Sequence, residues 1–200
     1  MRKKKAASIF QSYKKMGYNL AGIGVDDLAA GCAFLKDLDP EGTILASANL
    51  YCGKRPAFSP FRIFKAKGLR IGVVSVSGKA VPRGIPGGNE TEIQYSDPAL
   101  ERYMKKVSEN SDLVIVLSSM IPPREVEFVK KHPGVALIIS SGRTSPTRNP
   151  VRIGKTLVVS SHPRGKSVGI IRLFVRKNGD SGYVVNGSQN RLYLLEKRKH

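Results

Sequence analysis

Apolar residues recur at helical spacing in two segments near the start of the chain. In residues 6–16 they lie three or four positions apart, which predicts an amphipathic helix that ends at Gly17. Residues 27–38 show the same helical spacing. They follow Asp26, a residue type that can cap a helix N-terminus. The two predicted apolar faces consist of Ala6, Ile9, Phe10, Tyr13 and Met16, and of Leu28, Cys32 and Leu35.

Several later segments follow the patterns of β-strands. Residues 61–67 and 69–77 alternate around Gly68, which predicts a pair of antiparallel strands. Residues 113–117 and 135–139 are continuous apolar runs, typical of strands that are covered on both faces. Shorter strands are predicted over residues 18–23, 44–48, 155–160, 168–176, 183–185 and 191–195, with Asn178-Gly179 as a hairpin turn.

The order of these elements indicates an α/β fold with a mixed sheet. Helices are predicted over residues 98–109, capped by Asp97, and over residues 122–131, with a long loop rich in Pro and Gly over residues 78–95. Strands that alternate with helices and then follow one another directly favour this class. Ligands of such sheets bind beyond the carboxyl ends of strands, here in residues 24–31, 118–123 and 140–150.

The chain is strongly basic. Its 200 residues include 34 Lys and Arg against 15 Asp and Glu, a formal net charge of +19. This charge favours anionic partners. It is scattered and lacks the interleaved aromatic residues of single-strand binders, which argues against a dedicated nucleic-acid function.

The sequence carries no targeting segment that would fix its compartment. No apolar run approaches the roughly 20 residues that cross a bilayer. The basic residues 2–5 are not followed by an export segment, so we expect the chain as given to be cytoplasmic. A fragment of an exported, periplasmic protein would look the same. Cys32 and Cys52 form no Cys-x-x-Cys motif, and we expect Cys32 to be a small buried hydrophobe rather than part of a disulfide framework.

Six segments between residues 6 and 176 are similar, in the same order, to motifs of 5'-nucleotidase-type metallophosphoesterases. Residues 17–31 resemble the family stretch that begins Gly-Tyr-Asp and passes through Gly-Asn-His-Glu-Phe-Asp. Residues 45–50 and 68–73 resemble its Leu-Ser-Ala-Asn and Gly-Lys-Ile-Gly-Val strands. The remaining matches are residues 112–119 with the strand ending in Leu-Ser-His, residues 134–145 with the strand entering Gly-Gly-His-Thr-His, and residues 160–169 with Gly-Lys-Tyr-Leu-Gly.

The resemblance implies a mixed-sheet sandwich of the metallophosphoesterase type, present here as a single partial domain over residues 1–200 that lacks the N-terminal strands. Residues 177–200 would add a C-terminal hairpin or edge strand and a basic tail. The family's first motifs, Asp-x-His and Gly-Asp-x-x, would precede residue 1, so we expect a fragment of a longer protein or a rebuilt fold. A missing core strand would expose a central edge, which predicts self-association near residues 113–117 and 135–139.

The resemblance also identifies where metal ligands would stand. Family members bind two divalent metals, which activate water and hold the phosphoryl group. In this chain the ligand positions are occupied by Val25, Asp26, Ser119, Gly142 and Thr144. Valine and glycine side chains offer no lone pair, and hydroxyls are poor ligands for these ions. We therefore expect no metal cofactor and no catalytic residues, as in a pseudoenzyme.

The predicted function is a degenerate, non-catalytic 5'-nucleotidase-like domain that retains a phosphate or nucleotide pocket or serves as an interaction module. The candidate anion-binding residues are Ser141, Arg143, Arg164 and Lys166. Arg143 lies between two lost histidine positions and is expected to replace part of the metal charge. Two alternatives stay open: a phosphoric ester hydrolase that is active only with a missing N-terminal segment or partner protein, and an electrostatic nucleic-acid binder.

Overall fold

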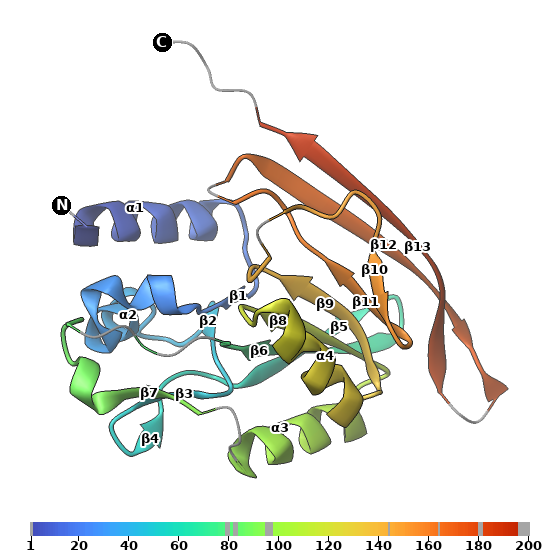
Figure 1. Cartoon of the computed structure of the whole chain (residues 1–200), viewed down its shortest axis with the longest axis horizontal. Helices are drawn as coiled ribbons and strands as arrows, with labels where there is room; N and C mark the ends of the chain where they lie inside the picture. Colours follow the sequence, from blue (N-terminus) through green and yellow to red (C-terminus); the bar gives the residue numbers. More distant parts are fainter. Residues whose placement is uncertain are drawn as a thin grey trace.

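A mixed β-sheet forms the centre of the molecule (Figure 1). The computed structural model describes residues 2–78, 81, 84–94, 98–143, 145–163, 165–179 and 182–195. Within this part, the sheet order is β10 (Val151–Ile153), β11 (Thr156–Val159), β9 (Val135–Ser140), β8 (Leu113–Ser118), β6 (Leu69–Val76) and β5 (Phe61–Ala66).

The inner strands of this sheet all run in the same direction. β6, β8, β9 and β11 are parallel, whereas β5 and β10 are antiparallel to their neighbours at the two edges. The carboxyl ends of the parallel strands therefore meet at one edge of the sheet. This arrangement confirms the predicted α/β class with a mixed sheet.

Two helices cover one face of the main sheet. α3 (Pro98–Glu109) and α4 (Pro122–Lys131) carry apolar stripes that pack on the alternate strand residues facing them. This core contains Val74, Val76, Val114, Val116, Ile138 and Val158 from the strands, and Leu100, Met104, Val107, Phe128 and Val129 from the helices. Burial of these side chains is the main stabilising interaction of the sheet.

A long hairpin covers part of the opposite face. β12 (Ser167–Lys177) and β13 (Tyr183–Leu194) pair antiparallel, with a register shift between Phe174 and Val175. The hairpin packs on the strands through one face, where Ile171, Leu173 and Val185 contact Leu137, Leu157 and Val159. Figure 1 shows it beside β10 and β11, on the side of the molecule opposite to α1 and α2.

The N-terminal residues form a second, smaller core. It includes α1 (Arg2–Lys15), β1 (Ala21–Gly22), a 3₁₀ helix η1 (Val25–Ala30), α2 (Cys32–Leu38) and β2 (Leu45–Ala46), which pairs parallel with β1. A small sheet of β4 (Arg55–Pro56), β3 (Leu50–Cys52) and β7 (Thr91–Ile93), the last preceded by η2 (Gly88–Glu90), lies beside it. The core side chains include Phe10, Ile23, Leu28, Leu35 and Leu50.

The predicted elements are largely present. α1, α3, α4 and the β5–β6 pair agree with the sequence patterns, and the β5–β6 turn uses positive φ angles at Lys67 (49°) and Gly68 (80°). The predicted helix over residues 27–38 is interrupted, because Gly31 adopts a φ of 88° between η1 and α2. Its start is not capped by Asp26; instead the Asp27 carboxylate accepts the Gly24 N–H at 2.8 Å. Asp97, the predicted cap of α3, lies outside the described residues.

The sequence analysis expected an unpaired strand edge near residues 113–117 and 135–139. These residues form β8 and β9, and neither strand has an unpaired edge. β8 pairs with β6 and β9, and β9 pairs with β8 and β11, so both strands are hydrogen-bonded along both edges. All six strands of the main sheet belong to this chain, and one of them, β10, was not predicted from the sequence. The open edges expected near residues 113–117 and 135–139 are therefore not present, and self-association itself stays a prediction.

The prediction for the cysteines was also wrong. Cys32, at the start of α2, forms a disulfide with Cys52, at the end of β3, with the two Cα atoms 6.4 Å apart. The sequence shows two cysteines 20 residues apart but does not show that the chain returns to bring them together. The bond ties α2 to the small sheet.

Candidate functional site

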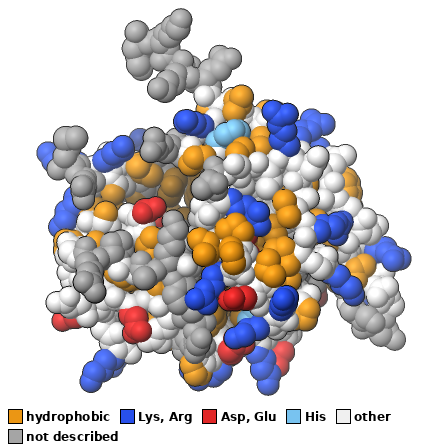
Figure 2. All heavy atoms as spheres, viewed as in Figure 1, with side chains coloured by type: hydrophobic (Ala, Val, Ile, Leu, Met, Phe, Trp, Pro, Cys, Tyr) orange, Lys and Arg blue, Asp and Glu red, His pale blue; other side chains and the backbone are white. Residues whose placement is uncertain are grey.

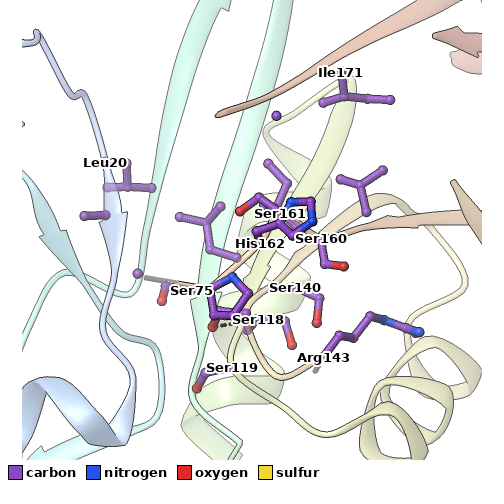
Figure 3. Close-up of a pocket in the computed structure, with 18 of the residues that line it drawn as sticks. Leu20, Ser75, Ser118, Ser119, Ser140, Arg143, Ser160, Ser161, His162 and Ile171 are labelled. Atoms are coloured by element: carbon purple, nitrogen blue, oxygen red, sulfur yellow. Dashed lines mark hydrogen bonds between the residues drawn. The ribbon is translucent and has the colours of Figure 1, made fainter. Parts of the chain in front are cut away.

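A pocket of about 520 Å³ lies at the carboxyl ends of the parallel strands (Figure 3). β1 forms one wall, the inner face of the β12–β13 hairpin forms another, and residues at the ends of β6, β8, β9 and β11 form the floor. Its volume lies within the range of about 300–1,000 Å³ common for small-molecule sites. The topology of the sheet predicts a site at this edge.

Serines from several strands line this pocket. Ser75 belongs to β6, and each of the next strands ends in a Ser-Ser pair: Ser118-Ser119, Ser140-Ser141 and Ser160-Ser161. Because the parallel strands end at the same edge, these pairs line the same pocket, and Figure 3 shows Ser118, Ser140 and Ser160 near one another. The sequence analysis singled out Ser119 and Ser141 but missed the repetition of Ser-Ser after successive strands, which was visible in the sequence.

Several of these hydroxyls stabilise the loops that follow the strands. The Ser118 hydroxyl accepts the Met120 N–H at 3.1 Å, and the Ser141 hydroxyl donates to the Ser118 carbonyl at 3.1 Å. The Ser160 hydroxyl donates to the Ser145 carbonyl at 3.0 Å. These bonds hold the strand ends together and fix the shape of the pocket floor.

The Ser140 hydroxyl differs from its neighbours. It is buried and has no hydrogen-bond partner within the described part of the chain, although Ser140 lines the pocket. A buried polar atom without a partner is costly, so such atoms in native proteins usually have a further partner such as water or a ligand. Among the described residues, the Ser140 hydroxyl is therefore a polar group of the pocket lining whose hydrogen-bonding capacity is not used within the protein.

Arg143 is engaged in an ion pair with Glu125 of α4. Its Nη2 donates to Glu125 Oε2 at 2.9 Å, and Glu125 is fully buried. Glu125 Oε1 also accepts the Ser118 hydroxyl at 3.3 Å. In Figure 3 the guanidinium of Arg143 points away from the serine cluster. The positive charge is therefore balanced inside the protein rather than presented to the cavity.

His162 and Tyr13 contribute the polar atoms of the walls. His162 Nδ1 lies 3.0 Å from the Ser167 hydroxyl, which also accepts the His162 backbone N–H at 3.0 Å. Tyr13 stacks on Tyr18, with ring centroids 4.6 Å apart. Partial burial raises the pKa of the Tyr13 phenol, with Asp27 and Tyr18 acting in the same direction, so Tyr13 stays a neutral hydrogen-bond donor. The sequence analysis did not identify Tyr13 or His162 as part of a site.

The predicted metal-ligand positions do not converge on a cation site. Val25 is buried in the N-terminal core, Asp26 is exposed at the start of η1, and Ser119 lines the pocket, where its hydroxyl accepts the Gly78 N–H at 3.2 Å. Thr144 lies outside the described residues.

Gly142 packs against the backbone of the loop after β8. A Cβ at this position would meet the Met120 carbonyl, 2.6 Å from its carbon, and would lie 3.0 Å from the Ser119 carbonyl oxygen. Any side chain here, including a histidine, would require the backbone to move. The described residues also contain no group of three or more His, Cys, Asp or Glu side chains that could hold a metal ion. The side chains at the described ligand positions therefore do not by themselves form a two-metal centre.

The candidate anion-binding residues are only partly brought together. Ser141 and Arg143 line the pocket, but Arg164 lies outside the described residues. Lys166 is exposed and is not among the residues of the pocket wall. Within the described wall, Arg143 is the one Lys or Arg, and its charge is paired with Glu125.

The fold of this chain is similar to the folds of several enzymes of known structure. No protein-family model and no curated protein sequence matches the chain. The fold is similar to that of the Thermus thermophilus sulfate thiohydrolase SoxB in complex with glycerol, with 19% identity and a TM-score of 0.80. It is also similar to a Thermus thermophilus 5'-nucleotidase precursor (16%, TM-score 0.73) and to the Haemophilus influenzae NAD nucleotidase NadN (15%, TM-score 0.71).

These similarities cover nearly all of this chain but less than half of each enzyme. The matches with SoxB, the 5'-nucleotidase precursor and NadN cover 93%, 96% and 94% of this chain, and 34%, 41% and 38% of those chains. The chain therefore has the fold of one part of 5'-nucleotidase-like enzymes. None of the described helices is both long and apolar enough to cross a membrane.

Proposed function

We propose that this chain is a non-catalytic, 5'-nucleotidase-like domain that binds a small hydroxylated ligand, such as a nucleoside or nucleotide, in the serine-lined pocket. The observation that carries the proposal is the Ser140 hydroxyl, which is buried, unpartnered among the described atoms and located in the pocket floor. The surrounding hydroxyls supply both donors and acceptors, the groups needed to bind ribose hydroxyls.

The charge of the pocket wall favours a ligand of low charge over free phosphate. Arg143 is neutralised by Glu125, and the described wall adds no other Lys or Arg. A free dianion would lose its hydration without meeting an unpaired cation. The base or another apolar group of a larger ligand can contact Leu117, Ile139 and Ile171, which line the same pocket. The earlier expectation that Arg143 holds phosphate is therefore not part of this proposal.

Binding calorimetry with the whole chain tests the pocket. Adenosine at millimolar concentration is expected to bind, AMP is expected to bind more weakly because its phosphate meets no unpaired cation in the described wall, and inorganic phosphate is expected to bind most weakly. Ser140→Ala should weaken adenosine binding by about tenfold, the effect of one lost hydrogen bond to a buried group. Ser111→Ala is the matched control, because the Ser111 hydroxyl is also buried and unpartnered but lies outside the pocket wall.

The results have distinct meanings. If none of the three ligands binds, the pocket is vestigial and the interaction-module hypothesis replaces this one. If Ser111→Ala weakens binding as much as Ser140→Ala, the loss comes from altered folding and not from a pocket contact.

The proposal that the chain is non-catalytic rests on its residues. Val25 is part of a hydrophobic core, and the packing of Gly142 leaves no room for a ligand side chain, so two of the expected metal positions cannot supply donors. We expect no stoichiometric zinc, manganese or iron in purified protein and no release of phosphate from AMP when these metals are added. Two equivalents of tightly bound metal, or multiple turnovers, would contradict it.

The main alternative is a hydrolase that needs additional polypeptide. It is favoured by the comparison enzymes, of which this chain covers 34–41%. It is also favoured by the open side of β1, which pairs with β2 along one edge in the described structure. A missing N-terminal segment or partner protein could occupy that side. Metal-dependent turnover that appears only in a longer form of the protein would establish this alternative.

A further inference from the structure

The outward face of the β12–β13 hairpin is exposed and apolar at one end. Ile171 and Leu173 of β12 point inward to the main sheet, so the alternate residues point outward. Val168 and Ile170 are accordingly 48% and 44% exposed. The register places Tyr193, 48% exposed, directly opposite Val168. These three side chains form an apolar patch on an otherwise open two-stranded surface.

Arginines continue this surface along both strands. Arg172 and Arg176 follow on β12, and Arg191 lies opposite Ile170 on β13; all three are exposed. They take part in none of the salt bridges formed among the described residues. We call Val168, Ile170, Arg172, Arg176, Arg191 and Tyr193 the hairpin face.

The segment that contains this face is basic. The described residues between 145 and 195 include eight Lys and Arg and no Asp or Glu. Figure 2 shows Lys and Arg, and no coloured Asp or Glu, at the upper right, where Figure 1 places β12 and β13. The local electrostatic field therefore favours an extended anionic partner rather than a small ion.

We propose that the hairpin face binds an anionic lipid surface. Arginines would contact lipid headgroups, while Val168, Ile170 and Tyr193 would enter the interfacial region, where apolar and tyrosine side chains are favoured. The extended hairpin is suited to a broad partner, because β12 has 11 residues, which span about 36 Å at the usual strand rise.

The same observations argue against a nucleic acid as the partner. Single-strand binders stack bases on several exposed aromatic rings. Phe174, the other exposed aromatic of the outward face, lies over Gly187, with its Cδ2 3.3 Å from where a Cβ of Gly187 would be, so its ring already has a packing role. Val168 and Ile170 offer no stacking surface.

Sedimentation with lipid vesicles tests this proposal with the whole chain. The protein should bind vesicles of equimolar phosphatidylcholine and phosphatidylglycerol, bind vesicles of phosphatidylcholine only weakly, and dissociate as salt is raised. The triple variant Arg172→Gln, Arg176→Gln, Arg191→Gln should weaken binding at least about tenfold. The triple variant Val168→Ser, Ile170→Ser, Tyr193→Ser should also weaken it, and circular dichroism would check its fold.

The matched control removes the same charge from another surface. Arg102, Lys105 and Lys106 are exposed on α3, so their replacement by Gln should change vesicle binding much less. Three outcomes would overturn the proposal: equal binding to neutral and anionic vesicles, an equal loss in the α3 control, or tighter binding to single-stranded or duplex DNA than to anionic vesicles at the same salt. None of these depends on ligand binding in the serine-lined pocket.

Discussion

At the scale of single residues, the structure at the carboxyl ends of the parallel strands depends on close contacts that tolerate few substitutions. Glu125 is fully buried below this edge and accepts hydrogen bonds from Arg143 and Ser118. Gly142 packs directly on the Met120 carbonyl. These contacts bring α4, β8 and the loop after β9 together, and they define the floor of the pocket.

Loss of Glu125 should be severe. Glu125→Ala would leave Arg143 largely buried without its carboxylate, which typically lowers the free energy of unfolding by about 3–5 kcal/mol. The exposed pair Arg124–Glu127 is the control, since Glu127→Ala should cost less than about 1 kcal/mol. Urea denaturation of the three proteins measures both values. A change below 1 kcal/mol for Glu125→Ala would show that the pair does not stabilise the fold.

Gly142→Ala should destabilise the protein through overpacking. Its Cβ would overlap the Met120 carbonyl, so the loop must shift at a cost of about 1–3 kcal/mol. Gly134→Ala is the matched control, because a Cβ there would meet no atom within 4 Å. Thermal unfolding of both variants gives the comparison, and an equal melting temperature for the two would contradict the close packing of Gly142.

At the scale of elements, two short connections hold the N-terminal core together. Asp39 follows α2 and accepts backbone N–H groups from Thr43, Ile44 and Leu45 at 3.0, 2.8 and 2.7 Å. The disulfide joins Cys32 at the start of α2 to Cys52 at the end of β3. Both connections act on segments in which few residues form helices or strands. The intrinsic secondary-structure propensity of these residues therefore contributes little to stability.

The Asp39 carboxylate should make stability depend on pH. Burial raises its pKa, but the hydrogen bonds from Leu45, Ile44 and Thr43 outweigh burial, and the pKa lies below the ordinary value of 3.8. The folded state therefore prefers the ionised form. Its contribution is fully present above about pH 4 and is lost as the pH falls through the folded pKa.

Asp39→Asn should accordingly lower stability at pH 7 by about 1–3 kcal/mol and flatten the decline of stability below about pH 4. Chemical denaturation across this pH range tests both effects. Asp37→Asn serves as the control, because Asp37 is an exposed residue of α2. A parent and an Asp39→Asn variant with parallel pH profiles would rule out this role for Asp39.

Reduction of the disulfide should lower stability by about 3 kcal/mol, the value expected for a closed loop of this size. Denaturation with and without dithiothreitol measures the difference. The Cys32→Ala, Cys52→Ala variant should be insensitive to dithiothreitol. If the parent is equally insensitive, the bond does not form in the protein as isolated.

At the scale of the whole molecule, the main sheet is the most stable unit and its periphery the least. β8 and β9 are paired on both edges and covered by α3 and α4, whereas β1 and β2 contribute two residues each and β10 lies at the edge of the sheet. Hydrogen exchange should therefore be slowest in β8 and β9 and faster in β1, β2 and β10. Uniform exchange across these strands would contradict this hierarchy.

The sequence by itself determined the class of the fold and the edge that carries the site. Apolar periodicity is a local property, so α1, α3, α4 and the β5–β6 pair could be predicted from it. The continuous apolar runs identified β8 and β9 as covered strands. The rule for carboxyl ends located two loops of the pocket, residues 118–123 and 140–150, whereas residues 24–31 do not line it and residues 160–163, which do, were not predicted. The expectation that Val25 and Gly142 leave two metal positions without donors also came from the sequence, and the absence of a metal stays a prediction.

Only the tertiary structure decided which distant groups meet. The Cys32–Cys52 bond, the Arg143–Glu125 pair and the contact of Gly142 with Met120 each join segments that no local pattern relates. The short strands β3, β4, β7 and β10 form because neighbouring strands supply their hydrogen bonds, not because of their own two or three residues. For the same reason, the edges of β8 and β9 could be known only once the whole sheet was assembled.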